Sequence, residues 1–545
     1  MLPATLRAAF LAMQLPLAQA GDDLFPLKGL LAPPLQARTL KSSEKDGIVT
    51  EEVMFHSEKD GDKSVDIFAY FSYPKGAKGL PAFVWNQGGL YKATTFWTEF
   101  GARRGYATLC IDFPIPGYRS TGGYPINSGL DLPTDPRKAP IYHGAVALLR
   151  AVSFLEARPQ VDKNRIGMAG SSWGGFFTTL MAGIDPRLKA CSSMFGCGNL
   201  HLGNAWWDGG GKNPMFDPIR DRWRTTLDPA WRLPRSKTPI AWFTGSNDHF
   251  YWLPAVMKSH DMAGGPRHLS ILPNWNHALT PEIDDQVFAW LDVHLKRAPG
   301  FLEAKPLELV KNGALWQARW KFAGPRKAAR AELHLSNGAA GNWESRCWKT
   351  YPAKIDGDAC TAAIPGGKLS YHLIGSVIDD AGYRYSTPML LVEPARFFPD
   401  GKPDLGYNGA GDWGGFEEGQ VAFIRLHGYP LPALSDDARS GKKAALLKPG
   451  KTTLPPLLFT GGISHRFSAF AKAEKESTIK LELLGQFSKT RMEATKEFTV
   501  GPAWTEMKLD SFPIGDELTA SIRAVLTVPK GAEVLVDEVS FRPLP

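Results

Sequence analysis

The chain has 545 residues, of which 43% are hydrophobic and 22% charged, a balance typical of globular proteins. The net charge of +8 is modest for this length, and no dense Lys/Arg block interleaved with aromatic residues occurs, so a nucleic-acid groove is not expected. No apolar run reaches the roughly 18 residues that a membrane span needs. At roughly 100 to 200 residues per domain, we expect several domains.

The N-terminal segment has the pattern of an export signal. Arg7 precedes the apolar stretch AAFLAMQLPL, and the small residues of AQA form a cleavage site before Gly21. Because Gln14 and Pro16 interrupt the apolar stretch, the alternative is a disordered N-terminus on a cytoplasmic protein. We expect residues 1–20 to be a signal peptide and the mature protein to be secreted or periplasmic.

Residues 21–298 alternate short β-rich runs with helical patterns, which predicts an α/β fold with a mostly parallel sheet and helices on both faces. A helix is expected between Ile141 and Leu155, where apolar residues recur at helical spacing before Pro159. Eight runs are expected to form the strands of the sheet: IVTEEVMFH, VDIFAYFSY, AFVWNQ, YATLCIDF, RIGMAG, ACSSMF, IAWFTG and LSILPN.

Helical periodicity disappears after the segment WLDVHLKRAPG. Residues 299–396 contain short alternating strands such as LWQARWKFA and RAELHLS, which predicts a small β-sandwich. The Pro- and Gly-rich residues 397–412 are expected to form a linker, and residues 413–545 are again strand-rich. The sequence therefore predicts two all-β domains after the α/β domain.

Five cysteines in an exported chain leave at least one unpaired. Cys347 and Cys360 are expected to form a local disulfide between two short strands. Cys110 lies in an apolar strand and is expected to be a buried small hydrophobic residue. The state of Cys191 and Cys197 is left open.

The segment GMAGSSWGGFF contains two adjacent serines after a predicted strand and before a helical pattern. A nucleophilic serine on a sharp strand-to-helix turn needs small residues two positions before and two after it. Gly170 and Gly174 flank Ser172 in this way, whereas Trp173 occupies one of these positions around Ser171. We predict Ser172 as the nucleophile, with a glycine-rich turn without chemistry as the alternative.

Serine is a poor nucleophile near neutral pH without a base and an acid that orients the base. In this strand-turn-helix context the acid and then the histidine follow along the chain. Asp248 follows the strand IAWFTG and His277 follows the strand LSILPN, so both are expected at the sheet edge where Ser172 emerges.

Other assignments compete with these two residues. Asp248 could instead cap the helix that follows it. His249, His260 and His268 compete with His277, but His268 opens its strand and His260 lies within a helical pattern. His249 adjoins the acid and is too close in sequence to be its evident partner.

The tetrahedral intermediate of acyl transfer needs hydrogen-bond donors for its oxyanion. The backbone N–H of Trp173 is one predicted donor, and the other is expected from Gly88 or Gly89 in NQGG, where an ordinary loop is the alternative. No paired cysteines or HExxH spacing occur, so we expect no metal or other cofactor for catalysis.

The long segment from about residue 200 to 236 is expected to form a cap over Ser172. Flat aromatic faces suit sugar rings or aromatic acyl groups, although tryptophan in a cap often serves packing alone. Together with the loops near the predicted catalytic residues, this cap supplies the four residues predicted to bind substrate: Trp206, Trp207, Trp252 and Trp275.

With these motifs in place, residues 40–297 resemble the α/β-hydrolase superfamily, nearest its acetyl xylan esterase, dienelactone hydrolase and prolyl oligopeptidase-like branches. TGSNDHFYWLP with LPNWNHAL is also similar to the PhoPQ-activated pathogenicity-related proteins. The resemblance implies a triad of Ser172, Asp248 and His277. NQGG stands where many relatives carry a His-Gly pair, and DFPIPGYRSTGG replaces the familiar RGxGxS loop.

The middle domain is similar to Ig-like sandwiches. The last region resembles jelly-roll carbohydrate-binding modules through GDWGGFEEG, HRFSAFAKA, VGPAWTEMKLD and AEVLVDEVSF. Such modules often hold a structural calcium, so this resemblance implies Glu417 and Asp537 as ligands. The alternative is a degenerate module that only packs against its neighbours.

These observations predict an exported serine esterase that removes acetyl or feruloyl-type groups from a polysaccharide or oligosaccharide substrate. One alternative is a secreted peptidase of prolyl oligopeptidase or dipeptidyl type, although no propeller-like repeat is present. The other is a non-catalytic glycan-binding protein on a hydrolase fold. The acyl group, the sugar and the oligomeric state are not predicted.

Overall fold

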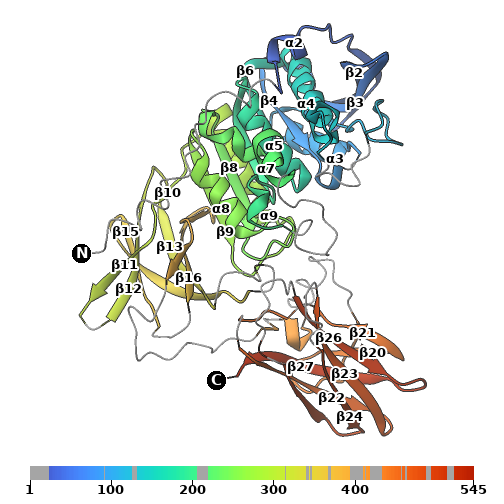
Figure 1. Cartoon of the computed structure of the whole chain (residues 1–545), viewed down its shortest axis with the longest axis vertical. Helices are drawn as coiled ribbons and strands as arrows, with labels where there is room; N and C mark the ends of the chain where they lie inside the picture. The colour runs from blue at the N-terminus through green and yellow to red at the C-terminus, as the bar shows by residue number, and fades with distance from the viewer. Residues whose placement is uncertain are drawn as a thin grey trace.

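The computed structural model contains an α/β part followed by two all-β parts (Figure 1). It describes the following residues: 24–90, 92–124, 132–204, 219–313, 315–338, 343, 346–365, 370–392, 409–410, 413–417, 432–455, 457–460, 463–486, 493–511, 513 and 521–544. The predicted signal peptide, residues 1–20, lies outside this set, as does most of the predicted linker, residues 397–412.

The α/β part is built on a nine-stranded sheet with the order β1-β2-β3-β5-β4-β6-β7-β8-β9. From β5 to β9 neighbouring strands are parallel, whereas β1, β2 and β3 join the sheet in antiparallel fashion. The strands are β1 (Arg38–Lys45), β2 (Ile48–Asp60), β3 (Lys63–Pro74), β4 (Leu80–Asn86), β5 (Ala107–Ile111), β6 (Val161–Ser171), β7 (Leu188–Met194), β8 (Ile240–Gly245) and β9 (Arg267–Leu272).

The eight predicted strands correspond to β2 through β9, so the mostly parallel α/β sheet is confirmed. The predicted number of strands is wrong, because β1 adds a ninth at the edge of the sheet. Every residue of β1 is exposed, and its sequence RTLKSSEK has no alternation of apolar and polar residues. Backbone pairing with β2 and a few side-chain bonds hold this strand, and apolar patterning does not reveal such a strand.

Helices cover both faces of the sheet: α4 and α5 pack on one face and α3 and α9 on the other. Strand β4 alternates between the two cores, with Val84 on the α4 and α5 side and Phe83 and Trp85 on the opposite side. The helices are α2 (Leu27–Leu31), α3 (Thr95–Arg103), α4 (Pro140–Glu156), α5 (Trp173–Ile184), α7 (Ile219–Thr226), α8 (Leu253–Met262) and α9 (Pro281–Leu295).

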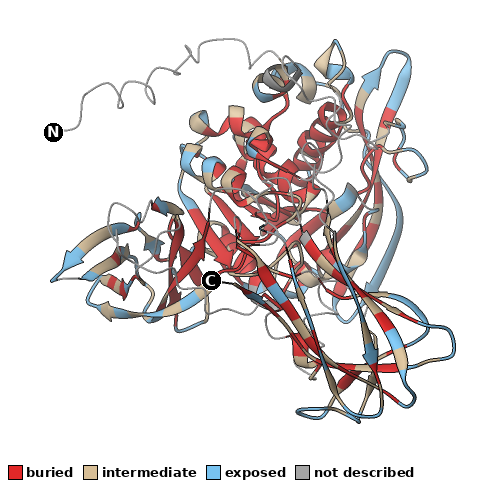
Figure 2. Ribbon diagram, turned by 60° about the horizontal axis from the view of Figure 1, so that its bottom comes forward, coloured by how far each residue is buried: buried red, intermediate tan, exposed pale blue. Residues whose placement is uncertain are grey.

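Figure 2 shows the buried residues concentrated in the sheet and in the sheet-facing sides of these helices. The predicted helix from Ile141 to Leu155 is confirmed as part of α4. Within the described ranges, no helix combines the length and the apolar character needed to cross a bilayer.

The middle part is all β, and its antiparallel strands pair along one connected path, β10-β12-β15-β14-β13-β16-β17, with β11 beside β12 and β18 beside β16. The hydrophobic core of this part includes Trp320 and Leu333. The strands are β10 (Glu303–Ala304), β11 (Glu308–Asn312), β12 (Leu315–Ala323), β13 (Ala328–Asn337), β14 (Lys349–Asp356), β15 (Ala359–Ala363), β16 (Tyr371–Asp379), β17 (Arg384–Ser386) and β18 (Leu390–Val392).

The C-terminal part contains two antiparallel sheets that share one core, with Phe467 contributed by the first sheet and Leu481 by the second. The first sheet has the order β19 (Ala433–Ser435), β20 (Ala444–Leu447), β27 (Val534–Pro543), β22 (His465–Ala473) and β25 (Thr505–Asp510). The second has the order β21 (Gly450–Thr453), β26 (Ser521–Val528), β23 (Ser477–Gln486) and β24 (Glu493–Val500).

All five cysteines are buried free thiols, so the predicted Cys347–Cys360 disulfide is wrong. Cys360 lies in β15 inside the core of the middle part. Cys347 lies in the segment before β14, where its N–H donates to the carbonyl of Phe459 from the C-terminal part at 3.4 Å. Burial raises the pKa of both thiols to about 12. Cys110 is buried in β5, as expected.

Candidate active site

Ser172 lies on the sharp turn between β6 and α5. Its backbone has φ 57° and ψ −122°, a conformation that non-glycine residues seldom adopt and that marks a strained elbow. A Cβ atom on Gly174 would lie 2.1 Å from the carbonyl oxygen of Asn86, and one on Gly170 would lie 2.7 Å from the same atom. The close approach of β4 therefore explains why both flanking positions hold glycine.

Asp248 follows β8 and is completely buried. Its Oδ1 accepts hydrogen bonds from the backbone N–H groups of Phe250 at 2.8 Å and Tyr251 at 3.0 Å. Helix α8 begins later, at Leu253, with Trp252 at its N-cap position. The carboxylate therefore stabilises its own loop and does not cap the helix.

His277 follows β9, and its Nδ1 lies 3.0 Å from Oδ1 and 2.9 Å from Oδ2 of Asp248. A carboxylate at this distance favours the tautomer that carries its proton on Nδ1. The unprotonated Nε2 is then available to accept a proton. The structure thus brings together the predicted acid and the predicted histidine.

Ser172 and His277 line the same pocket, which has a volume of about 460 Å³. Among the described residues no hydrogen bond joins their side chains, and such bonds are often long or poorly aligned before substrate binds. The ring of His277 packs edge-on against Phe195 at 5.4 Å and against Phe250 at 4.9 Å between ring centres. These aromatic rings restrict the orientation of the imidazole.

The competing histidines lie outside the described pocket lining. The backbone N–H and Nδ1 of His249 lie 3.1 and 2.6 Å from Oδ1 of Asn276, and burial lowers the pKa of His249. Burial also lowers the pKa of His260 to about 4 and that of His268 to about 3. Of the candidates, His277 alone contacts Asp248 and reaches the pocket.

The predicted oxyanion donors border the same pocket, which Trp173, Gly88 and Gly89 all line. A Cβ atom on Gly88 would lie 3.0 Å from the carbonyl oxygen of Ser171 and 3.1 Å from Cβ of Ser172, so glycine avoids a tight contact here. Gly89 has φ 59°, which also favours glycine. Trp173 is the first residue of α5 and directly follows Ser172.

Apart from Ser171, the remaining lining is apolar. Phe195 follows β7, Phe250 follows Asp248, and Ala278 and Leu279 follow His277. The described lining includes no Asp, Glu, Lys or Arg. Sequence reasoning missed these residues, although their positions just after strands at the edge that carries Ser172 could have indicated them.

The predicted substrate-binding tryptophans do not form the described lining of this pocket. Trp206 and Trp207 lie outside the described residues. The indole Nε1 of Trp252 donates to the carbonyl of His249 at 3.2 Å, and its ring packs against Gly203. The indole Nε1 of Trp275 donates to the carbonyl of Ala278 at 2.8 Å. Both rings therefore stabilise the loops around the pocket.

Glu417 and Asp537 do not fit the calcium site that sequence resemblance implies. Oε1 of Glu417 accepts the backbone N–H groups of residues 442–443, at 2.7 and 3.0 Å. Oδ2 of Asp537 accepts those of residues 439–440, at 2.9 and 3.0 Å. Backbone N–H groups thus bond to the carboxylate oxygens that would have to bind a cation. Among the residues that the structure describes, no cluster of three potential metal ligands exists.

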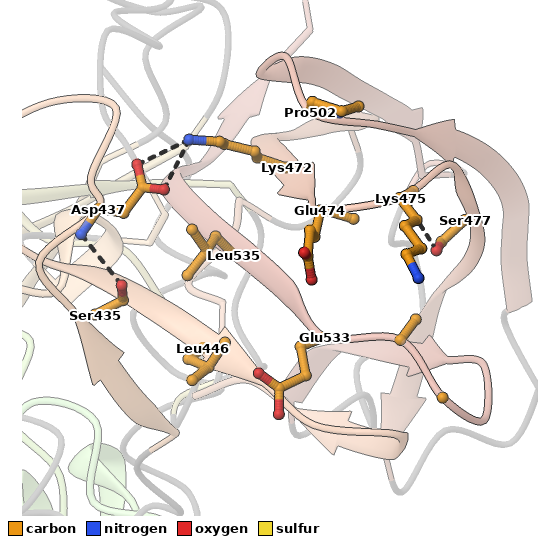
Figure 3. Close-up of a pocket in the computed structure, with 13 residues that line it drawn as sticks. Ser435, Asp437, Leu446, Lys472, Glu474, Lys475, Ser477, Pro502, Glu533 and Leu535 are labelled. Atoms are coloured by element: carbon orange, nitrogen blue, oxygen red, sulfur yellow. Dashed lines mark hydrogen bonds and ion pairs between the residues drawn. The ribbon is translucent and has the colours of Figure 1, made fainter.

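A second cavity, of about 630 Å³, lies in the C-terminal part (Figure 3). Nζ of Lys472 contacts both carboxylate oxygens of Asp437, at 3.0 and 2.7 Å, and Glu533 pairs with Lys448. No histidine occurs in its described lining. The cavity therefore lacks the kind of proton acceptor found beside Ser172.

No protein-family model matches the chain. Dipeptidyl-peptidase 5 of Porphyromonas gingivalis is 28% identical over 246 residues, which cover 40% of this chain and 34% of that protein. Acetyl esterase Axe7A of Xylanibacter ruminicola is 24% identical over 258 residues, 43% of this chain and 58% of that protein. The chain thus spans only 34% and 58% of the length of these curated relatives.

Among solved structures, an acetyl xylan esterase from Paenibacillus sp. R4 has a TM-score of 0.45 and 20% sequence identity. The match covers 54% of this chain and 100% of the esterase. The relatives of this chain are esterases and other hydrolases. Its own strand order and the turn at Ser172 are those of an α/β-hydrolase fold.

Proposed function

We propose that this protein is a serine hydrolase that cleaves carboxylic esters through an acyl-enzyme, with Ser172 as nucleophile, His277 as base and Asp248 as the orienting acid. The observation that carries this proposal is the contact of His277 Nδ1 with the buried Asp248. His277 also lines the same pocket as the strained Ser172. A base oriented by a buried acid, beside a serine at an elbow, is the arrangement that activates a hydroxyl.

In the proposed reaction, Oγ of Ser172 attacks the ester carbonyl carbon and its proton passes to Nε2 of His277. Asp248 stabilises the imidazolium that forms. Backbone N–H groups of Trp173 and of the Gly88–Gly89 turn stabilise the oxyanion. The alkoxide leaves with the proton from Nε2, and a water molecule, deprotonated by His277, then hydrolyses the acyl-enzyme and regenerates the serine.

The proposed substrate is an acylated polysaccharide or oligosaccharide carrying acetyl or feruloyl-type groups. Phe195, Phe250 and Leu279 make an apolar wall suited to a neutral acyl group, since the described lining carries no Asp, Glu, Lys or Arg side chain. The acetyl esterase among the relatives supports acetyl as the acyl group. No metal ion is part of the proposed chemistry.

A peptidase is the second candidate, and the similarity to a dipeptidyl-peptidase favours it. Peptidases that remove dipeptides must hold a charged amino terminus, commonly with acidic side chains. The described lining offers no such group near Ser172, so we rank the esterase first.

The test compares the wild-type protein with Ser172→Ala on three substrates: an aryl acetate, an acetylated or feruloylated oligosaccharide, and a Xaa-Pro anilide. We expect ester hydrolysis by the wild type alone, and a fluorophosphonate probe attached to Ser172 in fragment mass spectra. Cleavage of the anilide without ester cleavage would establish the peptidase. Absence of labelling would leave the non-catalytic glycan-binding protein.

We further propose that the protein is exported and that a signal peptidase cleaves before Gly21. The small-residue site AQA that precedes Gly21 supports this proposal. Expression in a bacterial host followed by separation of periplasm and cytoplasm should yield a periplasmic form that begins at Gly21. Recovery of the full-length chain from the cytoplasm alone would contradict export.

A further inference from the structure

The loops that carry Asp248 and His277 are bonded to the middle all-β part. Nδ2 of Asn247, the residue before Asp248, donates to the carbonyl of Arg346 at 2.7 Å. Asn274, in the loop of His277, makes two bonds to Trp348: its Nδ2 donates to the carbonyl, and its Oδ1 accepts the backbone N–H, both at 2.7 Å. The backbone of residues 346–348 therefore binds a side chain from each of the two loops.

The two loops are also bonded to each other at this place. Oγ of Ser246 donates to Oδ1 of Asn247 at 2.6 Å and accepts the N–H of Asn274 at 2.8 Å. The N–H of Asn247 donates to the carbonyl of Trp275 at 2.9 Å. A displacement of residues 346–348 would thus be transmitted to both loops together.

The contact of Asn247 is enclosed by protein, whereas those of Asn274 are partly buried. Asn247 is 2% exposed, Arg346 1% and Trp348 2%. A buried polar group that loses its partner is costly, because water does not replace the bond. The loops are consequently stable in the position that residues 346–348 define.

Residues 346–348 are themselves anchored on two sides. The guanidinium of Arg346 donates to the carbonyls of Asn337 and Gly338 at 3.4 and 3.3 Å, at the end of β13. Cys347 bonds to Phe459 of the C-terminal part, as described above. The segment is therefore a fixed support and not a free loop.

We propose that Asn247 and Asn274 are positioning residues, through which the middle all-β part holds Asp248 and His277 in register with Ser172. This inference rests on the proposed function of the triad and extends it to a second part of the chain. The middle part then belongs to the catalytic unit, although none of its described residues lines the pocket.

The expected effect follows from the geometry of proton transfer. Displacement of catalytic groups by about 1 Å can reduce the rate roughly 100-fold, while the binding of substrate changes little. We therefore expect kcat to fall roughly 10- to 100-fold in Asn247→Ala and in Asn274→Gly, with KM within about twofold of wild type. Glycine is chosen at 274 because Asn274 has φ 54°, which alanine tolerates poorly.

The matched control is Gln286→Ala in α9. Gln286 also bridges the two parts, since its Nε2 donates to the carbonyl of Arg384 at 2.7 Å and its Oε1 accepts the N–H of Arg384 at 3.4 Å. It is buried but makes no contact with either catalytic loop among the bonds of the described residues. We expect this variant to lose thermal stability and keep the kcat of the wild type.

All variants are assayed as full-length protein on an aryl acetate, with melting temperatures measured alongside. If kcat in Asn247→Ala and Asn274→Gly falls no further than in Gln286→Ala, the inference is overturned. Asn274→Asp, which keeps the acceptor for Trp348, provides a milder variant with an expected intermediate kcat if Asn274→Gly does not fold. A wild-type protein without Ser172-dependent esterase activity would refute the proposed function instead, so the two failures are distinguishable.

Discussion

Replacement of Asp248 by asparagine tests the role assigned to the buried acid. The two backbone N–H groups that Asp248 accepts can still bond to the amide oxygen of asparagine, so the loop should keep its conformation. The amide NH2 would then face Nδ1 of His277, which lies 2.9 and 3.0 Å from the two carboxylate oxygens. Nδ1 must become the acceptor, and the ring proton moves to Nε2.

A histidine protonated on Nε2 does not accept the proton of Ser172. In a serine protease the corresponding exchange lowers kcat by about 10⁴. At about 1.36 kcal/mol for each factor of ten, this loss corresponds to about 5.4 kcal/mol of transition-state stabilisation. We expect Asp248→Asn to lose three to four orders of magnitude in kcat on an aryl acetate, with KM within a few fold of wild type.

The control is Asp228→Asn, because Asp228 is likewise buried and accepts backbone N–H groups, from Asn199 at 2.8 Å, Leu200 at 3.1 Å and Ala230 at 2.8 Å. No contact to a histidine is among these bonds, so this variant should retain kcat. Steady-state kinetics and circular dichroism of both variants provide the comparison. If Asp248→Asn keeps more than a tenth of the wild-type kcat while folded, Asp248 does not orient the base.

Three further outcomes are expected. Gly174→Ala places Cβ 2.1 Å from the carbonyl oxygen of Asn86, so it should lower the free energy of unfolding by at least the roughly 1 to 3 kcal/mol typical of overpacking. This variant should also lose labelling by the fluorophosphonate probe. Gly29→Ala, with open space around its Cβ, should be neutral in thermal denaturation. Burial lowers the pKa of His268 from 6.5 to about 3, so its contribution to stability is complete above about pH 6.5 and is lost as pH falls toward 3. Urea denaturation between these pH values gives the free energy of unfolding as a function of pH. Its slope should be smaller in His268→Gln than in the wild type, by up to the equivalent of about one proton, and an unchanged slope would contradict a buried neutral imidazole. Thiol titration of the unfolded, unreduced protein should count five free cysteines, and a count of three would restore one disulfide.

Much of the α/β part could be predicted because its signals are local. A parallel strand buried on both faces is a continuous apolar run, as in β4 and β8, and such runs stand out in the sequence. The small residues around Ser172 reflect a steric requirement of the turn. Asp248 and His277 could be inferred from chain order, because the carboxyl ends of parallel strands meet at one edge.

Predictions that depended on contacts between distant segments were less successful. The exposed strand β1 has no apolar pattern that would reveal it. Cys347 and Cys360 are free thiols buried in different surroundings. Trp252 and Trp275 adjoin Asp248 and His277 in sequence, yet their indole N–H groups bond to neighbouring carbonyls. Sequence proximity to a catalytic residue does not determine on which side of a loop a side chain packs.

The sequence alone indicated the eight strands from β2 to β9, the sharp turn at Ser172 and the two strand ends that bear Asp248 and His277, since each follows from local sterics and apolar patterning. Only the tertiary structure decided which side chains surround the serine and that residues 346–348 of the middle part support both catalytic loops. The physical reason is that a hydrogen bond between Asn247 and Arg346, 99 positions apart, depends on how whole sheets pack and leaves no periodic trace in the chain.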